Sequence, residues 1–155
     1  MVLTGNLRNQ DFAGQDLRDA VFRDADLYRA RFDGARLEGV VFAGCFAAEA
    51  TFEAACCIEL RAANTNFYRC CFRSADLSGS LFWDCVLAGS DLRGAALKRI
   101  TLTLDCNSFE EIHLSCGASA ELAYLFGRAR SPHRLGWLDV VGVRDWARLD
   151  RLFRR

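Results

Sequence analysis

The chain of 155 residues carries 20 basic and 20 acidic side chains and therefore has no net charge, which argues against a nucleic-acid-binding or membrane-binding protein with a basic surface. Its length fits one domain, or one domain with a small appendage. No hydrophobic stretch reaches the length of a transmembrane helix, and residues 1–9 lack the apolar region of a signal peptide.

The dominant pattern is a large apolar residue at every fifth position from Leu7 to Leu102. Of the twenty positions in this series, seventeen are Leu or Phe, and the exceptions are Ala47, Cys57 and Ala62. Two residues before each position, fifteen of twenty residues are Gly, Ala, Ser, Thr or Cys. A period of five fits neither an amphipathic helix nor a half-buried strand. An uninterrupted small and large pair is typical of a solenoid, in which each unit buries its apolar face against its neighbours.

This frame contains the segments Ala25-Asp26-Leu27, Ala75-Asp76-Leu77 and Ser90-Asp91-Leu92. They resemble the A(D/N)LXX motif of the pentapeptide-repeat family, and the resemblance covers about two thirds of the chain. It implies an all-β solenoid, a right-handed quadrilateral β-helix with one pentapeptide per side and about five coils of roughly twenty residues. The large residue and the small residue two positions earlier would point inward, and the other three positions would face solvent.

Stacking the coils at an interval of twenty residues brings compatible inward side chains above one another. It places four phenylalanines, Phe12, Phe32, Phe52 and Phe72, in one column. Where the large position holds Ala62, the preceding inward residue is the large Leu60, so the volumes compensate in a close-packed interior.

The outward positions predict a wall of opposite charges on adjacent coils. Asp11 stacks under Arg31, Asp16 under Arg36, and Arg18 under Glu38, as in cross-strand pairs. We interpret most of this wall as solvated and mutually neutralised. Asp33 and Glu53 form a like-sign step that is suited to a basic partner, and two tyrosines lie two coils apart. The candidate partner-binding residues are Asp24, Asp26, Asp33, Glu53, Tyr28 and Tyr68.

The fourth side, whose large residues include Phe22 and Phe42, breaks the polar rule. Its outward residues are mostly apolar, and a contiguous apolar strip on a solenoid wall is typical of an interface. We predict an interface here, within one chain or between chains. Its candidate residues are Val21, Val41, Phe46, Leu81 and Trp83.

Eight cysteines raise the question of a disulfide framework or a metal site. The neighbours Cys56 and Cys57, like Cys70 and Cys71, would point to opposite sides of the wall, which suits neither a shared disulfide nor one tetrahedral zinc. We therefore expect the cysteines to act in packing, with no cofactor or metal. Free thiols in this number favour a reducing cytoplasm.

Beyond residue 104 the frame changes. Leu104, Phe109 and Leu114 keep the spacing of five but are displaced by two. The sequence therefore predicts a β-helix over 1–116, with a regular frame at 5–104 and an irregular last coil at 105–116. Over 117–155 it predicts an α-helical segment that forms a cap or a dimer contact.

The last predicted helix is short and amphipathic. Residues 145–153 place Trp146, Leu149, Leu152 and Phe153 on one side, and so short a helix needs a surface to dock on. The open last coil, the fourth-side strip and a second chain are the alternatives. We expect a homodimer through these helices, with Trp146, Leu149 and Phe153 as anchors.

No motif for catalysis is present. The sequence lacks a Gly-rich phosphate loop, a paired-histidine metal motif and a nucleophile elbow, and neither His113 nor His133 has a patterned catalytic partner. We therefore predict a protein that is not an enzyme. The family resemblance implies a rod that mimics DNA and protects DNA gyrase or topoisomerase IV from topoisomerase-poison antibiotics. The alternative is a scaffold or regulatory module with an unknown protein partner, and direct nucleic-acid or membrane binding is not expected.

Overall fold

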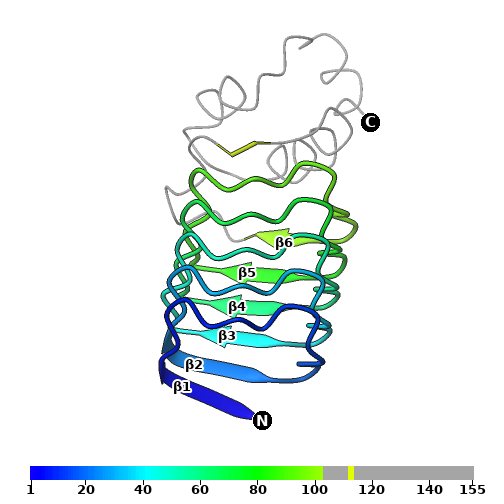
Figure 1. Cartoon of the computed structure of the whole chain (residues 1–155). Helices are drawn as coiled ribbons and strands as arrows, with labels where there is room; N and C mark the ends of the chain where they lie inside the picture. Colours follow the sequence, from blue (N-terminus) through cyan, green and yellow to red (C-terminus); the bar gives the residue numbers. More distant parts are fainter. Residues whose placement is uncertain (103–111, 114–155) are drawn as a thin grey trace, which may run out of the picture.

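Stacked parallel coils form a rod with short strands along one side (Figure 1). The computed structural model describes residues 1–102 and 112–113. Each coil takes twenty residues, because parallel bridges join Asp11 to Arg31 and Arg31 to Thr51. The predicted fold class is confirmed: the chain is an all-parallel β-solenoid of about five turns.

Each coil has four sides, and each side carries one large inward residue with an outward residue directly before and after it. We name the sides by their first inward residue: side one begins with Leu7, side two with Phe12, side three with Leu17 and the strand side with Phe22. The second residue after the inward one forms the corner, and its φ is positive throughout the described coils, as at Asn9 with φ 56°.

The strand side is a parallel sheet in which neighbouring strands follow one another along the chain in the order β1 to β6. The strands are β1 Val2–Asn6, β2 Val21–Asp26, β3 Val41–Ala43, β4 Arg61–Ala63, β5 Leu81–Trp83 and β6 Thr101–Leu102. From β2 to β5 the register is twenty residues per strand, so equivalent positions of successive coils lie directly above one another.

Sides one to three turn their corners differently from the strand side. On side one, the C=O of Leu7 accepts a hydrogen bond from the N–H of Gln10 at 3.2 Å, and Asn9 between them has a positive φ. This is the geometry of a type II turn. On the strand side, the corner residues Gly44 and Asn64 form bends instead, and the chain before them stays extended as strands.

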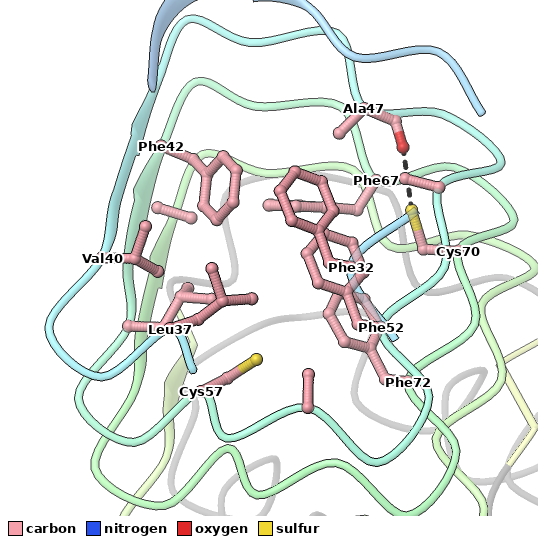
Figure 2. Packing of buried hydrophobic residues seen from close by; sticks show 14 of the residues in the cluster. Phe32, Leu37, Val40, Phe42, Ala47, Phe52, Cys57, Phe67, Cys70 and Phe72 are labelled. Carbon is pink, nitrogen blue, oxygen red and sulfur yellow. Dashed lines mark hydrogen bonds between the residues drawn. The ribbon is translucent and has the colours of Figure 1, made fainter. Parts of the chain in front are cut away.

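Phenylalanine ladders fill the interior (Figure 2). The predicted column is confirmed: adjacent rings of Phe12, Phe32, Phe52 and Phe72 are stacked with centroids 4.9, 4.8 and 4.7 Å apart. A second stack from the strand side, formed by Phe22 and Phe42, meets this column edge to face. Offset stacked and edge-to-face contacts are the favoured arrangements of aromatic rings.

The small residue Ala62 interrupts the second stack, and two neighbours fill the space. Leu60 is fully buried, as predicted. The structure adds Phe67 from side one, whose ring centroid lies 5.7 Å from that of Phe42 and 5.8 Å from that of Phe82. Phe67 therefore bridges the two rings above and below Ala62, which sequence reasoning missed.

Both ends of the regular frame carry a shift. At the amino end, β1 pairs Leu3 with Phe22 but Gly5 with Ala25, so one residue is taken up between Leu3 and Gly5. At the other end, Asp91 is bridged to His113, an offset of 22 residues instead of 20. The excess of two residues equals the displacement by two that the sequence suggests. The boundaries predicted at residues 104 and 116 and the helical segment predicted over 117–155 lie outside the described residues and stay predictions.

Candidate protein-binding surfaces

The interior offers no chamber for a substrate in the part of the chain that the structure describes. A small cavity lies at the carboxyl end of the regular coils, and its lining is entirely apolar: Leu77, Phe82, Leu87, Leu92, Leu97, Ile100, Leu102 and Ile112. Residues 1–102 and 112–113 hold no group of three His, Cys, Asp or Glu side chains placed to bind a metal. Nor does any helix among these residues have the length and apolarity of a membrane span. Candidate sites must therefore be sought on the outer wall.

The described cysteines are free thiols built into the packing. Cys45, Cys57, Cys70 and Cys85 are buried, while Cys56 is only partly buried. The Cys70 thiol lies 3.0 Å from the carbonyl oxygen of Ala47 (Figure 2), and burial raises the pKa values of Cys57 and Cys70 far above that of a free thiol. Since the thiolate is the reactive form, these buried thiols are chemically inert at neutral pH.

Two of the predicted ion pairs between adjacent coils form near the amino end of the rod. Arg31 lies 3.4 Å from Asp11 and Arg36 lies 3.6 Å from Asp16. Arg18 does stack under Glu38, since the N–H of the next residue, Asp19, donates to the Glu38 carbonyl at 3.0 Å, but its guanidinium binds Asp16 of its own coil at 2.7 Å with two hydrogen bonds. Asp16 and Arg18 lie on either side of the inward residue Leu17. An ion pair within one coil therefore competes directly with an ion pair between adjacent coils.

Two of the acidic candidates are already engaged by arginines of the rod. Asp26 pairs with Arg8 at 2.9 Å. Asp33 pairs with Arg31 at 2.9 Å and also accepts the backbone N–H of Glu53 at 3.0 Å. Burial would raise the pKa of Asp33, but these hydrogen bonds lower it. The two acidic residues Asp33 and Glu53 do lie on adjacent coils of side two, but Arg31 neutralises the charge of Asp33.

Asp24 and Glu53 are the acidic candidates that stay open to a partner. Both are exposed, and neither has an ion-pair partner within 1–102 and 112–113. They do not form one patch, because Asp24 lies at the corner that follows the strand side and Glu53 lies on side two.

An aromatic group on side one is the best-defined cluster on the wall. The Tyr28 ring stacks on Phe46, with centroids 6.2 Å apart, and its hydroxyl donates to Glu49 at 3.1 Å. The guanidinium groups of Arg8 and Arg29 lie 4.5 and 5.0 Å from the centre of the same ring, within the range of cation–π attraction. Phe46, predicted with the fourth-side strip, thus lies beside Tyr28, and 43% of its surface is exposed.

Tyr68 lies two coils above Tyr28 on the same side. Between them the outward position holds the small residue Ala48, which is buried, so no large side chain projects from the surface between the two tyrosines. Tyr68 is 37% exposed, and Arg69 lies 5.0 Å from the centre of its ring. We call Tyr28, Phe46 and Tyr68 the side-one aromatic cluster.

The predicted apolar strip lies on the strand side, where two arginines interrupt it. One outward column runs Val21, Val41, Arg61 and Leu81, and the other runs Arg23, Ala43, Ala63 and Trp83. Trp83 is 59% exposed, whereas Val21, Val41 and Leu81 are half-buried. We call these eight residues the strand face. Arg23 and Arg61 fall within these otherwise apolar columns.

The tail candidates Trp146, Leu149 and Phe153 lie outside the described residues, as does His133. His113 is exposed, and its backbone extends the solenoid: its N–H donates to Ser90 at 3.0 Å and its C=O accepts from Leu92 at 2.8 Å. The structural role found for His113 is therefore carried by its main chain.

Comparison with known protein families gives one match. The sequence model described as "Pentapeptide repeats (8 copies)" matches residues 6–44, 48–84 and 65–103. No curated protein matches the chain in sequence. The matched residues cover the part of the chain that forms the stacked coils.

Solved structures with a similar fold include three repeat proteins of low sequence identity. Rfr23 from the cyanobacterium Cyanothece 51142 is 22% identical with a TM-score of 0.42, over 65% of this chain and 60% of that one. A trypsin-treated form of QnrB1, a plasmid-mediated fluoroquinolone resistance protein, is 21% identical with a TM-score of 0.44, over 78% and 72%. HetL from Nostoc sp. strain PCC 7120, a protein involved in heterocyst differentiation regulation, is 19% identical with a TM-score of 0.38, over 68% and 53%. The chain thus spans less than two thirds of the length of Rfr23 and HetL, and at these values the likeness says nothing about what it binds.

Proposed function

Because the chain belongs to the pentapeptide-repeat family, we propose that it is a non-catalytic rod that binds another protein through outward side chains of its coils. The side-one aromatic cluster carries this proposal. Its exposed rings contribute nothing to the phenylalanine ladders of the interior, and aromatic residues flanked by arginine are enriched at the centres of protein interfaces. The free thiols of the described coils support a cytoplasmic location.

The specific partner that we propose is DNA gyrase or topoisomerase IV, with protection from topoisomerase-poison antibiotics as the outcome. The pentapeptide-repeat resemblance and the rod shape support this form of the proposal. The exposed carboxylates of Asp24 and Glu53 would supply the negative charge with which a DNA mimic meets a basic DNA-binding surface. Such attraction between exposed charges weakens as salt is added.

A scaffold with another protein partner is the second candidate, and one observation favours it. Asp26 and Asp33 are paired with arginines of the rod itself, so the amino-terminal wall is close to neutral. A neutral wall with exposed aromatic rings suits a partner that is recognised through apolar contact more than through charge.

Gyrase supercoiling in the presence of a gyrase poison, with this protein titrated at low and moderate salt, tests the specific proposal. We expect supercoiling to be rescued, and rescue to be lost in the Asp24→Asn/Glu53→Gln variant. That variant removes two charges without breaking an ion pair found in the described coils. The matched control is Asp19→Asn/Glu59→Gln, which makes the same charge change at exposed corners after side three and should keep the rescue.

The absence of rescue and of inhibition at micromolar protein, with both gyrase and topoisomerase IV, would exclude the topoisomerase proposal and leave the scaffold. The scaffold is tested by capture of a partner from a bacterial lysate with the wild type and with Phe46→Ser/Tyr68→Ser. A partner that both proteins retain equally would exclude the side-one aromatic cluster as the binding surface.

A further inference from the structure

The strand face has a charge pattern that its own coils do not use. Arg23 and Arg61 are its only charged residues, and neither forms an ion pair within residues 1–102 and 112–113. The rest of the face is apolar, and its Trp83 is the most exposed aromatic side chain of the described coils, at 59%. An exposed tryptophan together with arginines on an apolar surface is typical of the centre of a protein interface.

The order of residues along this face is self-complementary. The column after the inward residues runs Arg23, Ala43, Ala63 and Trp83 over the neighbouring strands β2 to β5 (Figure 1). One end of the column therefore carries a cation, and the other end carries the aromatic ring that binds cations best. When a second copy lies on this face with its rod reversed, Arg23 of each copy faces Trp83 of the other, and Ala43 faces Ala63.

Such a reversed pair has a two-fold axis that lies between the two faces, midway between β3 and β4 and parallel to the strands. Rotation about this axis keeps each column over the same column of the other copy and reverses its order. The contact is isologous, as in most dimers, so every residue pair occurs twice. In the other column, Val21 faces Leu81, and Val41 faces Arg61, whose aliphatic stem packs on apolar surface while its charge stays in water.

The alternative two-fold axis, parallel to the rod, suits the charges less well. It would place each arginine at the same level as the same arginine of the other copy, and Trp83 would have no cation opposite it. In the reversed pair the two Arg23 residues lie three strand spacings apart along the rod, about 14 Å, which exceeds the screening length of about 8 Å at physiological salt. Arg61 lies closer to its copy, about 4.8 Å along the rod.

We propose that the strand face is a contact between two copies of this chain, with their rods reversed. Each Arg23 guanidinium lies on the indole ring of Trp83 of the other copy, and Val21 and Leu81 pack beside it. The face spans about 14 Å from β2 to β5, and its two columns lie about 7 Å apart, so it is well below the roughly 800 Å² per partner of a stable interface. The dimer is therefore weak, and at low micromolar concentration Trp83 stays open to solvent.

Sedimentation of the full-length protein, over a series from low micromolar to near-millimolar concentration, tests this proposal. We expect the wild type to shift from monomer to dimer as its concentration rises. Arg23→Glu should weaken the association at least about tenfold, because both cation–π contacts are lost. Trp83→Arg should weaken it as well, because two arginines then face each other. Combining the two changes creates two ion pairs across the interface and should restore the dimer.

The two arginines of the strand face should respond in opposite directions. Arg23→Gln should weaken the association, whereas Arg61→Gln should strengthen it, because two like charges near the two-fold axis are removed. The matched control is Lys98→Glu, which reverses one exposed charge on side three and should leave the association unchanged. Circular dichroism of each variant reports whether the solenoid is folded.

A wild type that stays monomeric at every concentration would overturn the proposal. A dimer that both Arg23→Glu and Trp83→Arg leave intact would also overturn it, because the contact would then lie elsewhere in the chain. If both single variants lose the dimer and the folded combined variant does not regain it, the reversed arrangement is wrong.

Discussion

The strand side and side two of the solenoid place phenylalanine inward at the same spacing, yet their outer surfaces differ. On side two, Arg31 forms ion pairs with Asp11 of the coil below and Asp33 of its own coil. On the strand face, apolar residues surround two arginines that have no ion-pair partner in the described coils. The corners differ as well, with hydrogen-bonded turns on side two and bends after the strands.

This difference separates what makes the fold from what makes a surface for binding. Inward residues on every side obey one rule, because each coil must bury its apolar residues against the next. On side two, Arg31, Asp11 and Asp33 neutralise one another, and Glu53 is the acidic residue of that side that stays open to a partner. Outward residues of the strand face and of the side-one aromatic cluster are not accounted for by the coils, so we assign binding to them.

The largest effect is expected when one inward apolar residue is replaced by a charged residue. Phe52→Asp puts an unpaired carboxylate between the stacked rings of Phe32 and Phe72, and burial of an unpaired charge is among the most destabilising changes known. We expect circular dichroism to show an unfolded chain. The neighbouring outward change Glu53→Ala should shift the free energy of unfolding by less than about 0.5 kcal/mol. Equal tolerance of the two changes would show that the frame is assigned wrongly.

A second change compares a buried ring with an exposed one on the same side. Phe67→Ala removes the ring that fills the space left by Ala62, and we expect a loss of about 3–5 kcal/mol in unfolding free energy. Phe46→Ala makes the same chemical change on the outside of side one and should cost below about 1 kcal/mol. Urea unfolding measures both. Similar losses would mean that Phe67 does not fill the core in the way described.

A third change compares two corners. Gly44 after the strand side and Gly34 after side two both have positive φ, 66° and 63°, so alanine costs about 1 kcal/mol at either position. At Gly44 the new Cβ would also lie 2.5 Å from Asp24 Oδ1, whereas at Gly34 it meets open space. We expect Gly44→Ala to have the lower melting temperature, and adding Asp24→Ala to it should remove the difference. A lower melting temperature for Gly34→Ala would contradict this.

The smallest effect concerns the charged wall. Hydrogen bonding from Arg18 lowers the pKa of Asp16 to about 2 from its ordinary value of 3.8. A carboxyl group whose pKa is lowered in the folded state adds stability above its unfolded pKa and loses it as the pH falls through the folded pKa. Between about pH 4 and pH 2, the melting temperature of the wild type should therefore fall slightly more than that of Asp16→Asn. Parallel pH profiles would show that the pair adds nothing to stability.

The inward-facing residues could be predicted well from the sequence, because a single frame with a spacing of five places the Leu and Phe residues in the interior. The Phe column and the burial of Leu60 follow directly. Phe67 was missed because it fills a gap from a different side, and the partner of Arg18 was missed because stacking rules ignore pairs within a coil. The regrouping of Phe46 with Tyr28 depends on side-chain direction across a corner, which spacing does not encode.

The contrast between the inward and outward aromatic residues of the coils can be measured directly by hydroxyl-radical footprinting of the intact protein. The oxidation rates of Trp83, Phe46 and Tyr68 are compared after each is divided by the intrinsic reactivity of its side chain. The account predicts that all three react in proportion to their exposed 59%, 43% and 37%, while the buried rings of Phe52 and Phe67 are protected. Oxidation of Phe52 or Phe67 at least as fast as that of Phe46 and Tyr68 would contradict it.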